Sequence, residues 1–329
     1  MTNRNACRLA AALFLASLVS AWGGPGAARA ASCCGSGSNT TLLVPKYATA
    51  LADLSFDAES YHGFWNEKGR HTPDPAGADL NQYRLNLAAA YRFLPDWQFS
   101  LAVPYVWNDN RYSGLSSHTS GLGDTTVSVW YDLTDDQSPW RITSWRDLTP
   151  AVSLGVSLLL PTGYSPYDNV NSSFDVTGRG FYRLDGNLLV EKVIKHWDLT
   201  LSASYGSYFE RWVNREYGKL VEPYRKELGD RTSLSASLGY GFPLGSGGDL
   251  LTATASYAYL AESEVSFDGR ADPGSAFRKQ SVAGMLSFSG ADRDWSLRAG
   301  WRHDLRGSGW GRNFPSTDVL TVGVRYVFG

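Results

Sequence analysis

The residues of this sequence that could do ionic chemistry recur at every second position of a few segments. Asp53, Asp57 and Glu59 share one parity in a segment whose other parity is apolar. Alternate residues of a β-strand point to opposite faces, so these carboxylates would share one face. Basic side chains take the polar parity in three other segments, at Arg84, Arg92, Arg298, Arg302 and Arg325. An acidic strand between basic strands would form cross-strand ion pairs.

If the strands close into a barrel, the charged face would line its lumen, and two interpretations compete. In the first, the lumen is filled with water and the arginine-rich wall attracts anions, especially if the opposite wall carries small side chains. Such an opposite wall is predicted from three other segments, with inward Ser202, Ser204, Gly206, Ser233, Ser235, Ser237, Gly239, Thr252, Thr254 and Ser256. In the alternative interpretation, the arginines pair with the acids and fill the lumen, as side chains do in the smallest barrels. We favour a narrow open path, because small residues would waste space in a filled interior.

The sequence offers little for catalysis or metal binding. The five histidines are scattered, at His62, His71, His118, His196 and His303, and none has a metal-ligand spacing such as H-x-x-x-H. No metal site and no cofactor is predicted. The main catalytic alternative is a lipid-acting enzyme that uses His303 on a lipid-facing surface, although no serine and asparagine partners are evident for it. We therefore predict that the protein is not an enzyme.

Alternating strands would position these residues. The clearest strand places Trp97, Phe99, Leu101, Val103, Tyr105 and Trp107 on one face. About twelve such segments occur, at 50–58, 83–93, 97–107, 125–133, 152–160, 182–190, 199–209, 232–242, 251–259, 282–288, 295–305 and 318–329. An apolar face towards lipid and a polar face towards a lumen are typical of outer-membrane barrels. We predict an all-β fold: a transmembrane antiparallel up-and-down β-barrel of about twelve strands, of the Gram-negative outer-membrane type.

The connections between these segments alternate in length. Most links after even strands are short, such as Leu94-Pro95-Asp96, with Thr134 to Pro150 as the exception. Links after odd strands are long and polar, at about 62–81, 109–122, 162–180, 210–230, 261–277 and 306–317. Short periplasmic turns and long outer loops are the habit of such barrels. Both termini are then expected in the periplasm.

Aromatic residues mark the expected membrane edges. The girdle is assigned to Trp97, Trp107, Trp197, Trp295, Tyr326 and Phe328, because rings with a polar tip prefer the lipid–water boundary. The separation from Trp97 to Trp107 corresponds to roughly 25 Å of membrane at a tilt near 40°. The last strand, which ends at Phe328 before Gly329, resembles the C-terminal signal for barrel assembly. The barrel-assembly machinery is therefore an expected partner.

The N-terminus predicts export. Residues 1–30 resemble a signal peptide, with Arg4 and Arg8 before an apolar core and Ala28-Arg29-Ala30 as the cleavage site. Residues 31–46 are expected to form a periplasmic leader with Cys33-Cys34, and residues 47–329 the barrel. The cysteine pair could be acylated, redox-active, metal-binding or structural, and we favour a structural or incidental pair. The predicted location is the outer membrane of a Gram-negative bacterium.

Two short motifs carry a family resemblance. Gly121-Leu122-Gly123-Asp124 opens one strand, and Leu160-Pro161-Thr162-Gly163 closes the next. Their order and spacing resemble those of the phenol meta-pathway degradation family of transporter-like outer-membrane barrels, over residues 83–329. The resemblance implies a channel for small, often hydrophobic or aromatic compounds, and brings no catalytic residues. From the residues alone, these glycines and Pro161 suit strand ends, and Asp124 suits a rim position that bonds loop amides.

The leading functional hypothesis is passage of small molecules, a solute of unknown identity, through the lumen. A structural or partner-binding scaffold that presents its loops or its cysteine leader is the second hypothesis, and a lipid-acting enzyme is the third. Outer-membrane lipid and lipopolysaccharide are expected to surround the barrel. A net charge of −2 gives no reason to expect nucleic acid as a partner.

Overall fold

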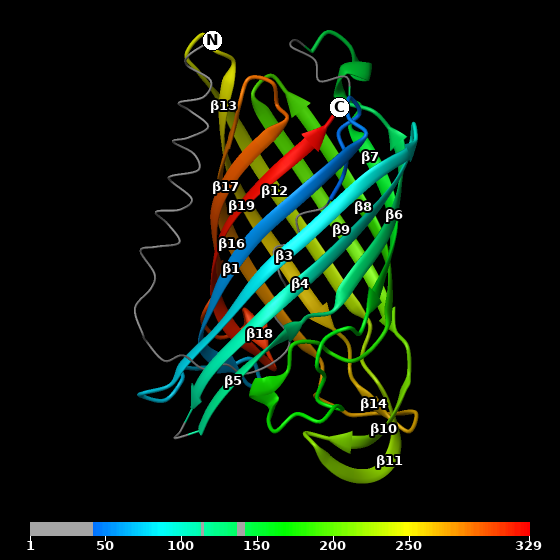
Figure 1. Cartoon of the computed structure of the whole chain (residues 1–329), viewed down its shortest axis with the longest axis vertical. Helices are drawn as coiled ribbons and strands as arrows, with labels where there is room; N and C mark the ends of the chain where they lie inside the picture. The colour runs from blue at the N-terminus through cyan, green and yellow to red at the C-terminus, as the bar shows by residue number, and fades with distance from the viewer. Residues whose placement is uncertain (1–41, 113–114, 137–141) are drawn as a thin grey trace.

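The protein folds into one closed ring of antiparallel strands (Figure 1). The computed structural model describes residues 42–112, 115–136 and 142–329, so the predicted signal peptide and Cys33-Cys34 lie outside the described residues. Each strand of the ring pairs with the next one along the chain, and the first pairs with the last. The twelve strands of the barrel are β1 (Ala50–Trp65), β3 (Asp79–Leu94), β4 (Trp97–Tyr112), β6 (Thr125–Thr134), β7 (Ala151–Leu160), β8 (Arg183–Ile194), β9 (Trp197–Tyr208), β12 (Arg231–Leu244), β13 (Asp249–Glu262), β16 (Phe277–Ser289), β17 (Trp295–Asp304) and β19 (Phe314–Phe328).

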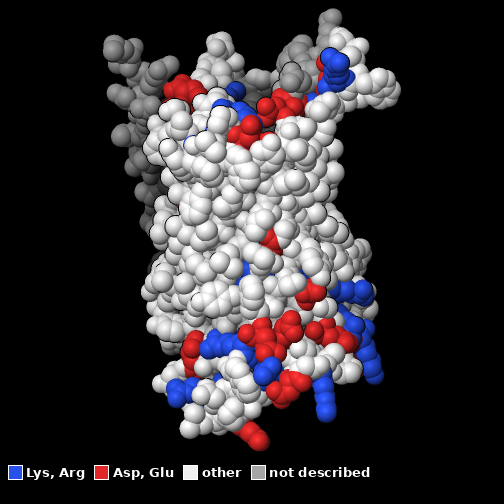
Figure 2. Space-filling view, turned by 90° about the vertical axis from the view of Figure 1, so that its right-hand side faces the viewer, with Lys and Arg blue, Asp and Glu red and all other residues white. Residues whose placement is uncertain are grey.

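The apolar parity of these strands faces outward. Along β1, the inward residues are buried, whereas Leu54 and Phe56 are exposed. The same holds for Leu87, Val156 and Leu286, which are 52%, 55% and 54% exposed. Figure 2 shows charged side chains gathered at the two ends of the molecule and few in the band between them. A belt of exposed aliphatic side chains between charged ends is what contact with lipid requires. Among the described residues, no helix is long and apolar enough to cross a membrane.

The two ends of the barrel differ. The end with short turns, uppermost in Figure 1, holds the C-terminus and is called the turn end. The opposite loop end carries extra strands, which sequence analysis had assigned to loops: β2 (His71–Thr72), β5 (Leu115–Leu122), β10 (Arg211–Glu216), β11 (Lys219–Glu227), β14 (Ser266–Phe267), β15 (Arg270–Ala271) and β18 (Gly311–Arg312). These strands carry polar residues on both faces, so they lack the alternation on which strand prediction depends. We expected long polar loops at 109–122 and 210–230, whereas these ranges contain β5, β10 and β11.

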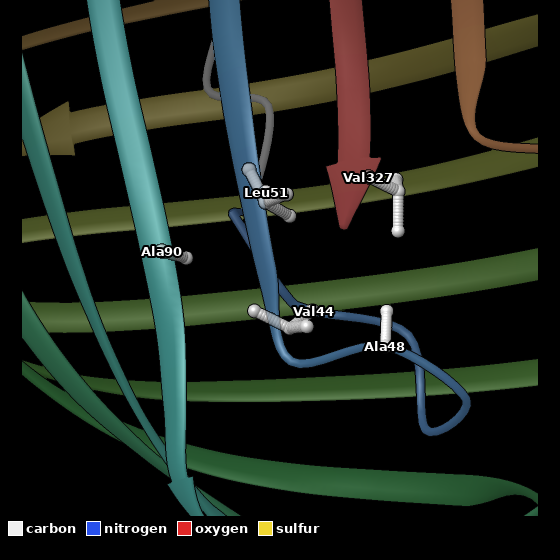
Figure 3. Close-up of a cluster of buried hydrophobic side chains, with 5 residues drawn as sticks. All are labelled: Val44, Ala48, Leu51, Ala90 and Val327. Atoms are coloured by element: carbon white, nitrogen blue, oxygen red, sulfur yellow. The ribbon is translucent and has the colours of Figure 1, made fainter. Parts of the chain in front are cut away.

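Residues 42–49, here called the plug, lie inside the turn end of the barrel (Figure 3). Val44 and Ala48 are buried against the inward side chains of Leu51, Ala90 and Val327. Residues 42–46 belong to the segment that we expected to be a periplasmic leader. Burial of apolar surface holds these residues inside the barrel. Their position was not predictable, because residues that precede a strand have no alternating pattern that indicates burial.

Residues 161–182, here called the strap, connect β7 to β8 at the loop end. Two short 3₁₀ helices lie on the connections of the barrel: Trp145–Leu148 at the turn end and Ser173–Asp175 within the strap. Thr177 and Gly178 donate their backbone N–H groups to the carbonyl of Tyr164, which folds the strap back on itself. The strap is therefore an ordered segment with its own internal hydrogen bonds.

Candidate functional site: the barrel lumen

The ionic wall of the lumen lies at the seam where the first and last strands meet. Asp53 on β1 accepts two hydrogen bonds from the Arg298 guanidinium on β17, at 2.6 and 2.5 Å, and one from Arg325 on β19 at 2.8 Å. The Asp53 and Arg298 side chains are 3% and 6% exposed. Two-pronged pairing of this kind is among the strongest of charged hydrogen bonds. Three of the residues predicted for the lumen thus form one clasp.

Further along the same wall, Glu59 on β1 forms an ion pair with Arg84 on β3 and lies 3.7 Å from the Arg302 guanidinium. Asp57 has no arginine at this range among its described contacts. Its carboxylate accepts from Thr321 at 2.6 Å and from Asn86 at 2.9 Å. The charges of this wall are therefore largely satisfied within the wall.

Arg92 departs from the expected arrangement. It does not contact the acids of β1 but forms an ion pair with Asp132 on β6 at 2.9 Å and donates to the carbonyl oxygen of Val44. Gln98 completes this contact, because its side-chain oxygen accepts the Val44 backbone N–H at 2.6 Å. Parity had placed Arg92 on the inner face, but its partners come from outside the neighbouring strands. Arg92 is a residue that anchors the plug.

The opposite wall consists of small and hydroxyl-bearing residues. Ser202 on β9 and Ser235 on β12 are register partners, and their hydroxyls lie 2.7 Å apart. On β12 and β13, Ser237 pairs with Ser256 and Gly239 with Thr254. Hydroxyls that bond to one another carry no charge, and the inward charged residues of these strands stand near the strand ends, at Asp198, Arg231 and Glu262. Between those ends, the lumen therefore has a largely self-paired ionic wall facing a neutral wall of short side chains.

The two sequence motifs meet at the foot of the strap. Gly121 and Gly123 lie where β4 changes its partner from β5 to β6, and the Gly123 N–H donates to Pro104 at 2.8 Å. Asp124 accepts the backbone N–H groups of Gly163 at 3.2 Å and Arg179 at 2.7 Å. Thr162, which follows Pro161 at the end of β7, donates to the Gly123 carbonyl at 2.6 Å. The motif residues thus join the strap to the barrel wall.

Sequence analysis missed the residues that hold the strap across the loop end. Arg179 forms an ion pair with Glu262 on β13 and donates to the Tyr208 hydroxyl on β9 at 2.9 Å. Arg231 also pairs with Glu262, at 3.2 Å. Glu262 and Arg231 had the inward parity but stood at strand ends, outside the apolar runs that were counted. Arg179 lies in the strap, where no period assigns a direction.

Asp175 anchors the strap on the other side. Its carboxylate accepts hydrogen bonds from the Ser117 and Thr119 hydroxyls of β5 and from the Ser172 N–H. Burial works to raise the pKa of Asp175, but these donors stabilise the anion and hold its pKa below the ordinary value of 3.8. Asp175 is therefore ionised whenever the strap is in place near neutral pH.

Near the loop end, the outward face of the barrel carries a row of polar residues of the types that a lipid-acting enzyme would use. Their order across the strands differs from that of a catalytic triad. His303 pairs in register with Asp318, Asp318 with Ser60, and Ser60 with Asn81. The strands that neighbour β17 are β16 and β19, so Ser60 on β1 and Asn81 on β3 stand two and three strands away from His303. His303 bonds to Asp318 at 2.6 Å, while Ser60 donates to Asn81 at 2.5 Å. A serine nucleophile needs the histidine as its base, whereas here the aspartate stands between them.

In the described part of the chain, no group of three or more His, Cys, Asp or Glu residues is arranged to hold a metal ion.

The predicted girdle residues lie on the outward face. At the turn end, Trp97 contacts Tyr131 with ring centroids 4.9 Å apart, and Trp197 contacts Tyr240 at 4.8 Å. Further ring contacts there are those of Trp295 with Phe288 and of Tyr326 with Phe328. Near the loop end, Trp107 contacts Tyr105. Aromatic rings therefore border the exposed aliphatic band towards both ends of the barrel.

Comparison with solved structures places this fold among outer-membrane barrels. The COG4313 outer membrane channel from Pseudomonas putida F1 is similar over 90% of this chain and 100% of its own, with 17% identity and a TM-score of 0.62. The beta domain of the Bordetella autotransporter BrkA covers 85% of this chain and 100% of its own, with 11% identity and a TM-score of 0.49. The Pseudomonas putida toluene transporter TodX covers 92% and 96%, with 10% identity and a TM-score of 0.40. No curated protein matches the chain.

A sequence profile of one protein family matches residues 90–314, which hold both strand-end motifs, the strap, the neutral wall of the lumen and, from the ionic wall, Arg298 and Arg302. On this match the chain belongs to the family described as Putative MetA-pathway of phenol degradation.

Proposed function

We propose that the protein is a restricted outer-membrane channel for small molecules, with the turn end in the periplasm and the loop end outside the cell. The observation that carries this proposal is the asymmetry of the lumen. Charged side chains of the seam neutralise one another, whereas β9, β12 and β13 point short neutral side chains at them. Long side chains on one wall and short ones on the other leave room for a path along the short wall.

The solutes that suit this path are small molecules with little charge, including hydrophobic or aromatic compounds. Asp53 is shared by Arg298 and Arg325, and Glu59 pairs with Arg84, so this wall is left with little net charge to select an ion. The family description, which concerns phenol degradation, agrees with an aromatic solute. An anion path along a free arginine wall, the expectation from sequence, is less well supported because these arginines are paired.

The proposal includes export: a signal peptide at residues 1–30 is removed, and the rest of the chain reaches the outer membrane. The exposed outward face of β19 would be the part recognised by the assembly machinery, and the aromatic borders would contact membrane lipid and lipopolysaccharide. A lipid-acting enzyme remains the weaker candidate, because His303 and Ser60 bond to different partners.

Conductance of the purified barrel in planar bilayers and solute uptake in liposomes test this function. We expect small ion steps with weak selectivity and measurable uptake of small neutral or aromatic solutes. Replacing Arg84, Arg92 and Arg298 together by glutamine should shift selectivity towards cations, because their acidic partners lose their counter-ions. Absence of both conductance and uptake would favour the scaffold hypothesis, and unchanged selectivity would reject the assignment of the ionic wall.

A further inference from the structure

The strap is tied to two opposite walls of the barrel. At its near wall, Asn108 and Asn110 of β4 donate their side-chain N–H groups to the carbonyl oxygens of Val176 at 2.9 Å and Phe174 at 2.7 Å. The Thr177 hydroxyl donates to the Leu122 carbonyl of β5 at 2.7 Å. Two of these bonds use backbone carbonyls of the strap and the third uses a side chain, and together they fix the path of the chain over residues 174–177 on this side.

At the far wall, the long side chain of Arg179 makes the contacts. Its guanidinium bonds to Glu262 on β13 and to the Tyr208 hydroxyl on β9, and it lies over the Tyr208 ring, 5.1 Å from the centroid. The Tyr208 hydroxyl in turn donates to Glu262 at 2.9 Å. Arg179 is 14% exposed and Glu262 3% exposed, so their contact is shielded from water.

The two walls face each other across the barrel. In the ring, β4 and β13 are separated by β6, β7, β8, β9 and β12 on one side, and by β3, β1, β19, β17 and β16 on the other. Val176 and Arg179 are only three positions apart in the strap, yet they are bound to these opposite strands. The strap and the Arg179 side chain together therefore bridge the loop end between opposite walls.

We propose that the strap is the gate of the loop end and that the Arg179–Glu262 contact is its latch. The near wall acts as the hinge, because it binds the strap through several backbone groups. The far wall releases, because a flexible arginine side chain can leave Glu262 without breaking the fold of the strap. This proposal rests on the proposed function, since a gate serves a lumen that solutes enter.

The first experiment measures entry into the lumen without requiring conduction. A reporter thiol, Ser235→Cys, is placed on the neutral wall in a Cys33→Ser and Cys34→Ser background, and a membrane-impermeant maleimide is added at the loop end. We expect Arg179→Gln to speed labelling about tenfold, the scale on which loss of a favourable contact shifts a two-state equilibrium. Arg179→Lys should restore part of the slow rate. Arg225→Gln is the matched control, since Arg225 is exposed on β11 and pairs with Glu210.

Equal labelling rates in the parent, Arg179→Gln and Arg225→Gln proteins overturn the gate. Folding of each variant is checked by the shift in gel mobility that boiling causes in barrels. A lock at the latch itself gives an independent answer. Arg179→Cys with Glu262→Cys replaces the two side chains of the latch, in the same background without the reporter, and a cleavable bifunctional thiol reagent with the reach of the lost arginine side chain joins them.

Joining this pair should reduce conductance, and cleavage of the link should restore it, if the strap must move for solutes to pass. Conductance that is the same in both states overturns the gate. A barrel that never conducts, but whose reporter labelling still follows the latch, would reject the channel and keep the gate. A conducting barrel that is insensitive to latch and lock would reject the gate and keep the channel.

Discussion

Replacing Asp53 by asparagine should destabilise the barrel far more than its size suggests. The change removes the negative charge that Arg298 and Arg325 share, and leaves two guanidinium groups facing each other at the seam. Removing one partner of a buried ion pair costs about 3–5 kcal/mol. We expect the lower end of that range, because Arg325 is 24% exposed to the lumen and water there screens the remaining charge.

The assay is urea unfolding of the barrel in lipid vesicles, in which stability changes shift the midpoint while the slope stays constant. Asp96→Asn is the matched control: Asp96 pairs with Lys46 but is 51% exposed, so its loss should cost less than about 1 kcal/mol. Adding Arg298→Met to Asp53→Asn should recover part of the loss, because it removes an unpaired buried charge. Equal costs at Asp53 and Asp96 would refute the view that the seam clasp is a buried pair.

Three further changes test the plug, the strap and the lumen wall. Val44→Asp should unseat the plug, because a carboxylate would enter an apolar cluster, and conductance should rise; an unchanged conductance would show that the plug does not narrow the path. Because the pKa of Asp175 is lowered from 3.8, its contribution to holding the strap is complete above that pH and is lost as the pH falls through the lowered value. Conductance should therefore increase only in strong acid, and Asp175→Asn should conduct at neutral pH without this transition. Gly155→Ala should cost about 1–3 kcal/mol in urea unfolding, since its methyl group would lie 2.6 Å from the Trp130 ring; a neutral effect would mean that Trp130 moves freely.

The strands and their inner and outer faces were predictable because lipid imposes a strict period of two. Parity alone placed Asp53, Arg298 and Arg325 on the inside, and chain order made their strands neighbours. The alternation also ended where the membrane ends. Beyond that level, β5 and β10 carry polar residues on both faces, and the sequence pattern could not distinguish them from loops.

The partners that close the barrel were not predictable in this way. Val44 precedes the first strand, and Arg179 belongs to a connection, so neither has a parity that assigns a direction. Their positions depend on side chains from strands far apart in the sequence, such as Gln98 for Val44 and Glu262 for Arg179. Arg92 shows the same limit, because parity gave its face but not its partner.

The clasp at the seam also has a consequence for biogenesis. Asp53 and Arg325 are 272 positions apart, so an exported chain presents its first strand long before the counter-ion of that strand is available. Glu59 can pair with Arg84 as soon as β3 is present, but Asp53 must stay hydrated, or be shielded by whatever holds the unfinished sheet, until the last strands dock. Completion of the cylinder is thus tied to charge neutralisation, and a chain that lost its final strand would keep an acidic, water-seeking edge unsuited to insertion in lipid.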